Sequence, residues 1–136
     1  MASELRVNTL KDASGNNSIA TSFVAGGSAK HFVIYDCTDA SRAIQNSLNC
    51  SSLSDLATGQ TSVSYTNNFS NVHYTHGGAA AWDGGDIVSA ALQNAATKTS
   101  DITTSAIELS TRYVTASAAG LYDYDYAQNT SLGDLA

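Results

Sequence analysis

The chain has 136 residues, of which 43% are hydrophobic and only 13% charged, and its formal net charge is −6 at pH 7. This length fits one domain, and six scattered Lys and Arg residues argue against nucleic-acid binding, which needs clustered cations to displace phosphate counterions. No apolar run approaches the roughly 20 residues that span a bilayer, and the start lacks the order of a signal peptide. We therefore expect cytoplasmic synthesis without membrane insertion.

The composition favours strands over helices. Thr, Val, Ile and Tyr have stiff or flat side chains that pack well on a pleated sheet, whereas the good helix formers Glu, Lys and Arg are sparse. Cys37 and Cys50 are the only cysteines. A reducing cytoplasm would leave them as thiols, and we interpret them as small buried hydrophobes, with a disulfide as the alternative.

Residues 1–27 differ from the rest of the chain. LRVNTL alternates apolar and polar residues like a short strand, DASGNNS supplies turn residues, and SIATSFVAGG ends in two glycines. So few large apolar groups cannot offset the entropy of ordering this segment alone. We predict an anchoring or oligomerisation segment over 1–27 and a β-sandwich domain over 28–136. The candidate anchor residues are Leu5, Val7, Leu10, Ile19 and Phe23.

The next stretches read as short strands. In KHFVIYDC, residues 31, 33, 35 and 37 share one face, and both faces are largely apolar, so this strand should be central. SRAIQNSLNCSSL fits a strand pair or a short helix, and we favour a strand over 47–53. DLATGQ is a predicted turn. TSVSYTNNF is a predicted strand with Val63 and Tyr65 pointing inward, and NVHYTH is expected to pair beside it.

The second half is more ambiguous. HGGAAAWDGGD has the glycine content of a long surface loop. IVSAALQNAATKTSD has the best helical pattern in the chain, although a strand over 86–92 also fits. SAIELSTRYVTAS returns to period two, with residues 107, 109, 111, 113 and 115 on one face. Several short strands with turns between them predict an all-β fold, a β-sandwich or jelly-roll.

The sequence offers little catalytic chemistry. His73 and His76 lie three residues apart, which on a strand points them to opposite faces and disfavours joint metal binding. No framed nucleophile or phosphate-binding glycine loop appears. We therefore expect no catalytic residue, no cofactor and no metal site.

The closing stretch LYDYDYA alternates tyrosines with acids. On a strand, Tyr122, Tyr124 and Tyr126 would pack inward or across a subunit contact, while Asp123 and Asp125 would face solvent and discourage edge pairing. A calcium ion shared by these acids and a neighbouring strand is the alternative. With Trp82, which is either buried or exposed at a loop tip, the three tyrosines are the candidate receptor or interface contacts.

Several of these motifs together resemble a known family. LRVNTLKDASGN, then GSAK before an alternating strand, then NSLNCSSLSDLATGQTSVSYTNNFSNVHY and a final GDLA, are similar to short tail-fibre, appendage or structural virion proteins of marine bacteriophages, including cyanophages. The resemblance covers nearly the whole chain. It departs at two places: family members often carry Trp soon after the GSAK motif, where this chain has His31 and Phe32, and their final strand is more evenly apolar.

The resemblance implies a non-enzymatic structural subunit located in the virion. Its expected partners are two further copies in a homotrimer, other tail, portal-proximal or capsid proteins, and a glycan or receptor on the host surface. A capsid-surface decoration (cement) protein of the same fold is the alternative within the virion. A carbohydrate-binding module that uses Trp82 and the terminal tyrosines is the alternative outside it.

Overall fold

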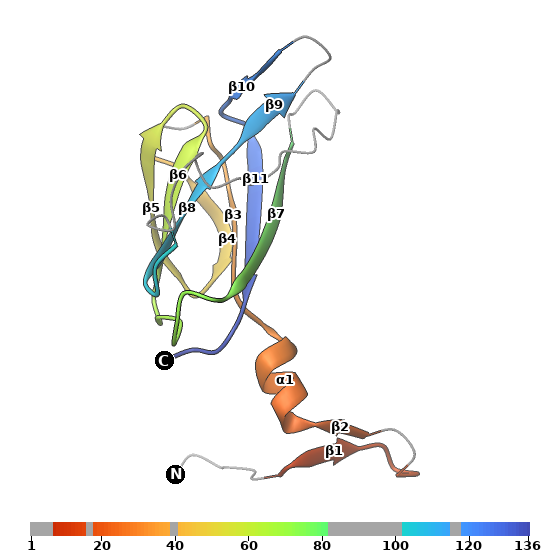
Figure 1. Cartoon of the computed structure of the whole chain (residues 1–136). Helices are drawn as coiled ribbons and strands as arrows, with labels where there is room; N and C mark the ends of the chain where they lie inside the picture. The colour runs from red at the N-terminus through yellow and green to blue at the C-terminus, as the bar shows by residue number, and fades with distance from the viewer. Residues whose placement is uncertain (1–6, 16–17, 39–40, 82–101, 115–117) are drawn as a thin grey trace.

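A computed structural model describes residues 7–15, 18–38, 41–81, 102–114 and 118–136. These residues form antiparallel sheets and one short helix, which confirms the predicted all-β fold (Figure 1). The first sheet has the order β4 (Ile44–Leu48), β3 (Ala29–Tyr35), β11 (Tyr126–Leu132), β7 (Thr75–Ala81). The second has the order β5 (Cys50–Ala57), β6 (Gln60–Tyr65), β8 (Ala106–Ser110).

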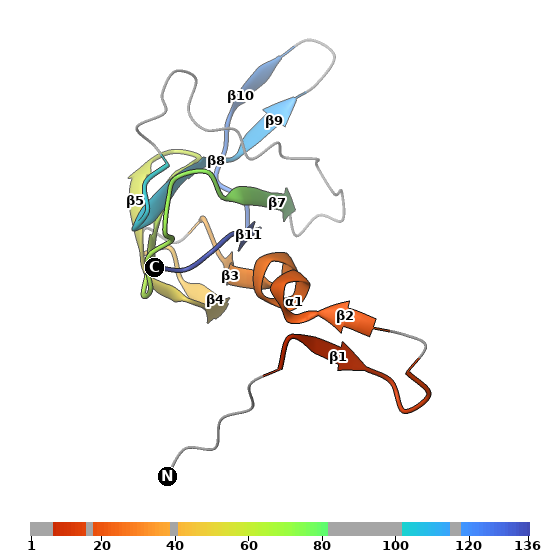
Figure 2. The same ribbon diagram turned by 60° about the horizontal axis from the view of Figure 1, so that its bottom comes forward.

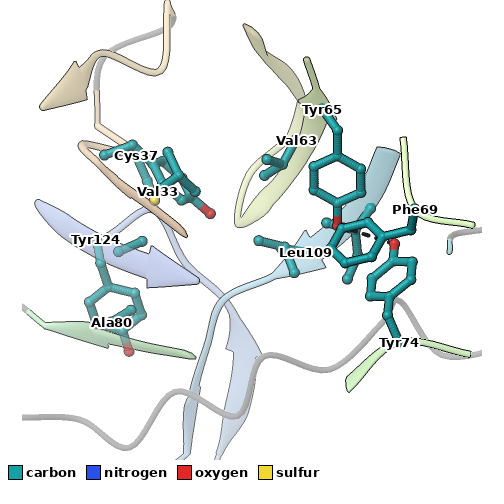
Figure 3. Close-up of a cluster of buried hydrophobic side chains, with 12 residues drawn as sticks. Val33, Cys37, Val63, Tyr65, Phe69, Tyr74, Ala80, Leu109 and Tyr124 are labelled. Carbon is teal, nitrogen blue, oxygen red and sulfur yellow. Dashed lines mark hydrogen bonds between the residues drawn. The ribbon is translucent and has the colours of Figure 1, made fainter. Parts of the chain in front are cut away.

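The two sheets face each other across one core (Figures 1 and 3). Inward positions alternate along β3, β6, β8 and β11, as the pleat of a strand requires. The ring of His31 on β3 meets that of Tyr65 on β6 edge to face, with centroids 4.9 Å apart. Tyr65 in turn packs on Phe69 and Tyr74, so an aromatic cluster fills one end of the sandwich.

β3 is central, as its two apolar faces predict. It lies between β4 and β11, and His31, Val33, Tyr35 and Cys37 are all buried. The inward orientation of Val63 and Tyr65 on β6 is confirmed as well.

The strand predicted over 47–53 is wrong in one respect, because the chain changes sheets within it. Asn49 has φ +56°, a left-handed conformation that ends β4 and starts β5 in the opposite sheet. The Asn49 side chain stabilises this corner of the backbone. Asn49 Nδ2 donates to Asn67 O at 3.0 Å, and Asn67 N donates to Asn49 Oδ1 at 2.6 Å. The predicted turn DLATGQ is also shorter than expected, since β5 continues to Ala57.

The glycine-rich stretch from His76 to Ala81 is a strand rather than the predicted loop. It belongs to β7, which pairs with β11 over its whole length and not with β6, so the expected pairing of NVHYTH is wrong too. Glycine and alanine weaken a strand, but here the neighbouring ladder of β11 supplies the hydrogen bonds. Trp82 and the ambiguous segment to residue 101 lie outside the described residues.

The continuous strand predicted from residue 105 onward breaks at Thr111. β8 ends at Ser110, and a separate hairpin of β9 (Arg112–Val114) and β10 (Ala119–Leu121) follows. The backbone leaves the β8 strand at Thr111, because Thr111 N donates to Gly59 O at 2.8 Å and Thr111 Oγ1 donates to Tyr122 O at 2.6 Å. Thr115 lies outside the described residues.

Before the sandwich, β1 (Thr9–Lys11) and β2 (Ser18–Ala20) form a hairpin that leads into α1 (Thr21–Gly27). Figures 1 and 2 show these elements projecting from one end of the sandwich. We call residues 7–28 the N-terminal unit. Its helix ends at Gly27 and β3 begins at Ala29, which is where the sequence predicts a division; that 1–27 acts as an anchor stays a prediction.

Gly59 should be the glycine least tolerant of a side chain in the sandwich. Its φ is +64°, and a Cβ there would lie 2.6 Å from both Thr111 O and Tyr122 N. We expect Gly59→Ala to lower the free energy of unfolding by about 3 kcal/mol, from left-handed strain and crowding combined, as measured by urea denaturation. Gly77→Ala is the matched control, because its Cβ would meet nothing within 4 Å. Equal stability of the two variants would contradict the expectation.

Candidate interaction surface

The N-terminal unit leaves its apolar side chains exposed. Phe23 is 74% exposed, and α1 buries no residue at all. The exposed large hydrophobic residues of the unit are Val7, Leu10, Ile19, Phe23 and Val24. Four of these are predicted anchor residues, and Leu5, the fifth predicted one, lies outside the described residues.

Three more exposed apolar residues lie on the end of the sandwich next to this unit. Leu48 and Leu135 border one hollow together with Ala29 and Lys30, the first residues of β3. A second hollow brings Gly26 of α1 beside Asn71 and His73, the neighbours of exposed Val72.

We call these eight residues the basal surface: Val7, Leu10, Ile19, Phe23, Val24, Leu48, Val72 and Leu135. Of the exposed large hydrophobic residues that the structure describes, only Ile44 and Leu56 lie elsewhere. Five of these eight residues belong to the short N-terminal unit, and apolar side chains left exposed on one segment commonly mark a site that binds another protein. The helix α1 is too short to cross a membrane, as is true of every helix in the described part of the chain.

The three tyrosines predicted as receptor or interface contacts differ in their exposure. Tyr122 and Tyr126 are half-buried, but Tyr124 is 1% exposed and belongs to the buried core cluster drawn in Figure 3. Its hydroxyl donates to Arg112 O at 3.3 Å. Tyr124 is therefore unavailable to a receptor, and its role as a surface contact is corrected. Residues 122–125 are not a strand either, since β11 begins at Tyr126.

Asp123 does not face solvent as a simple alternation predicts. It pairs with Arg42, whose Nη1 lies 2.9 Å from Asp123 Oδ1, and the same oxygen accepts the N–H of Gly59 at 2.7 Å. Arg42 Nη2 also lies 2.6 Å from Asp55 Oδ1 and donates to Ala57 O at 3.2 Å. One guanidinium thus joins two carboxylates from distant parts of the chain.

This ion-pair cluster is a structural element rather than a binding site. Arg42 is only 2% exposed, and burial alone would lower its pKa, but hydrogen bonds to Asp55 and Asp123 raise the pKa overall. The cation is therefore fixed at any physiological pH. Sequence reasoning missed it because an arginine in a polar stretch is usually a surface residue; the scarcity of arginine in this chain was the available signal.

A second buried polar cluster places a serine, a histidine and an asparagine together. Ser131 Oγ lies 3.5 Å from His31 Nδ1 and 3.4 Å from Asn129 Oδ1, and Asn129 Nδ2 donates to Gly77 O at 3.2 Å. The residue types match those of a nucleophilic site, but all three are essentially inaccessible. A substrate cannot reach the hydroxyl, so the cluster serves packing and strand pairing.

The remaining candidate chemistry is weak. Both thiols are free, and burial raises the pKa of Cys37 to about 11, so it is a poor nucleophile at neutral pH. Among the residues that the structure describes, no three His, Cys, Asp or Glu side chains gather as metal ligands would.

Comparison of the chain with protein-family models, curated proteins and solved structures finds no match.

The Arg42 cluster should contribute strongly to stability. Arg42→Ala leaves the carboxylates of Asp55 and Asp123 without their cation, and we expect a loss of about 3 kcal/mol in the free energy of unfolding, as measured by urea denaturation. Lys30→Ala, which removes a cation from the exposed end of β3, should change it by less than about 0.5 kcal/mol. A similar small effect for both variants would show that the cluster is not stabilising.

Buried His31 should make stability depend on pH. Desolvation lowers its pKa from 6.5 to about 4. Between these two pH values the unfolded chain binds a proton on this imidazole and the folded chain does not. Its contribution is fully present above pH 6.5 and falls by about 3 kcal/mol as the pH drops to 4. His31→Gln should remove this component, measured as the difference between the two stability curves from pH 7 to pH 4. Parallel curves would contradict the expectation.

Proposed function

We propose that the chain is a non-enzymatic structural protein of a bacteriophage virion, a fibre or appendage subunit that docks through residues 1–27 and projects its β-sandwich. The single observation that carries a docking role is the basal surface. The word virion comes from the resemblance of the sequence motifs to phage appendage proteins.

The energetics of the N-terminal unit support docking. A hairpin of two three-residue strands and a seven-residue helix are far too short to be stable in isolation, and their apolar side chains face outward. Burying such surface gives about 25 cal/mol per Å², so a partner that covers Phe23 and Ile19 would order the unit and hold the subunit at once.

The sandwich suits the projecting role. Its core is continuous through both sheets, and the hairpin β9–β10 extends at the end opposite the N-terminal unit (Figure 1). The polar groups that could suggest catalysis, His31, Ser131 and Arg42, are buried and engaged in holding strands together. This supports a mechanical role rather than a chemical one.

The proposal requires the protein to be a component of finished particles. Mass spectrometry of gradient-purified virions of the phage whose genome carries this coding sequence should detect it, and antibody labelling in electron microscopy should locate it outside the capsid shell or along the tail. Its presence in infected cells but not in purified particles would overturn the proposal.

Phe23→Glu should impair docking without unfolding the sandwich. Phe23 is the most exposed of the large hydrophobic residues described, and a charge in a buried apolar contact is strongly unfavourable. We expect at least a tenfold drop in the amount incorporated into particles and an unchanged melting temperature. Leu56→Glu is the control, since Leu56 is also a large exposed apolar residue but lies away from the basal surface. Equal incorporation of the two variants would count against docking through the N-terminal unit.

A further inference from the structure

In the part of the chain that the structure describes, β4 and β7 are the two edge strands of the first sheet. Within the described residues, β4 pairs only with β3 and β7 pairs only with β11. The outer side of an edge strand presents backbone N–H and C=O groups that can pair with a strand from another chain. Both edges are therefore potential sites of strand addition.

These two edges also lack the usual protection against such pairing. Proteins commonly block an edge with charged residues or proline, yet β4 (IQNSL) and β7 (THGGAAA) contain neither. The edges of the second sheet differ, because β5 includes Asp55 and β8 includes Glu108. The first sheet is the one whose edges are left uncharged.

The two edges have complementary shapes. Beside β7 lies an open hollow of about 490 Å³, bordered by Gly77, Ala79, Thr130 and Leu132. On β4, Ile44 is 41% exposed and Leu48 is 48% exposed. One edge therefore has space where the other has bulky apolar side chains.

The register of the sheet aligns these features. One row across the sheet runs from Leu48 through Phe32 and Thr130 to Gly77. The next row on the same face runs from Asn46 through Ile34 and Gln128 to Ala79. If a second copy continued the sheet without a shift, its Leu48 would stand beside Gly77 and its Asn46 beside Ala79. Strand directions alternate across all four strands, so the new pair would also be antiparallel.

We propose that β7 of one copy pairs with β4 of a second copy, so that the first sheet continues between subunits and Leu48 fills the hollow beside Gly77. This contact shares Leu48 with the basal surface but uses none of the N-terminal unit, and it goes beyond the proposed function because it joins two copies of the chain. Pairing β7 with itself would bring together mainly the small side chains of its glycines and alanines. Because the contact joins two different edges, repetition gives a closed ring or an open chain.

Charged substitutions on β7 and β4 of the full-length protein test the pairing. Native mass spectrometry and sedimentation velocity should show concentration-dependent association of the unaltered chain. Ala79→Lys and Asn46→Glu each place one unpaired charge in the contact and should weaken association at least tenfold. The double variant A79K/N46E brings opposite charges together across the pair and should recover most of it.

Two controls separate this contact from other effects. Ser54→Lys puts the same charge on β5, an edge of the second sheet, and should leave association unchanged, while melting temperatures check that every variant folds. Phe23→Glu should still associate through β4 and β7 even where it fails to enter particles, so the two proposals fail separately.

Three outcomes would overturn the pairing of β7 with β4. The first is a chain that stays monomeric at every concentration measured. The second is association that neither Ala79→Lys nor Asn46→Glu weakens. The third is a loss of association with only one of the two variants, or with both but without recovery in A79K/N46E, because each of these results would assign the contact to another pair of surfaces.

Discussion

The buried guanidinium of Arg42 holds together parts of the chain that neither sheet connects. Asp55 lies on β5 in the second sheet, Asp123 lies in the irregular segment before β11 of the first, and Arg42 follows β3. The hydrogen bond from Gly59 N to Asp123 adds the turn between β5 and β6. With so few charges in the chain, this single cation fixes the end of the sandwich far from the N-terminal unit, while apolar and aromatic packing fixes the other end.

The sequence predicted the structure correctly where apolar and polar side chains alternate along a strand. The buried faces of β3 and β6 follow from period two, because large apolar residues must all point to one side of a pleated strand. The N-terminal segment could be predicted as separate from the domain for a related reason, since its few apolar residues could not form a core of their own. These residues, Leu10, Ile19 and Phe23 among them, are exposed in the structure.

Where the decisive contacts join distant residues, sequence reasoning failed. β7 consists largely of glycine and alanine, and only its pairing with β11 makes it a strand. The tyrosine and aspartate alternation looked like a strand, yet Thr111 and Arg42 draw residues 122 and 123 out of any ladder. Asn49 could not be identified as a corner because its left-handed conformation depends on Asn67, 18 residues further along the chain.

The hydrogen bond from Asn129 Nδ2 to Gly77 O matters for the register of β7 against β11, because the residues of β7 around it are small. A strand of glycine and alanine gives little side-chain preference between one register and another. The buried amide of Asn129 needs a carbonyl that points toward it, and a slip of β7 by one residue would turn that carbonyl away and leave the amide unsatisfied. Asn129 thus disfavours the slip that would also exchange the two faces of β7, a constraint that comes from β11 and not from the sequence of β7 itself.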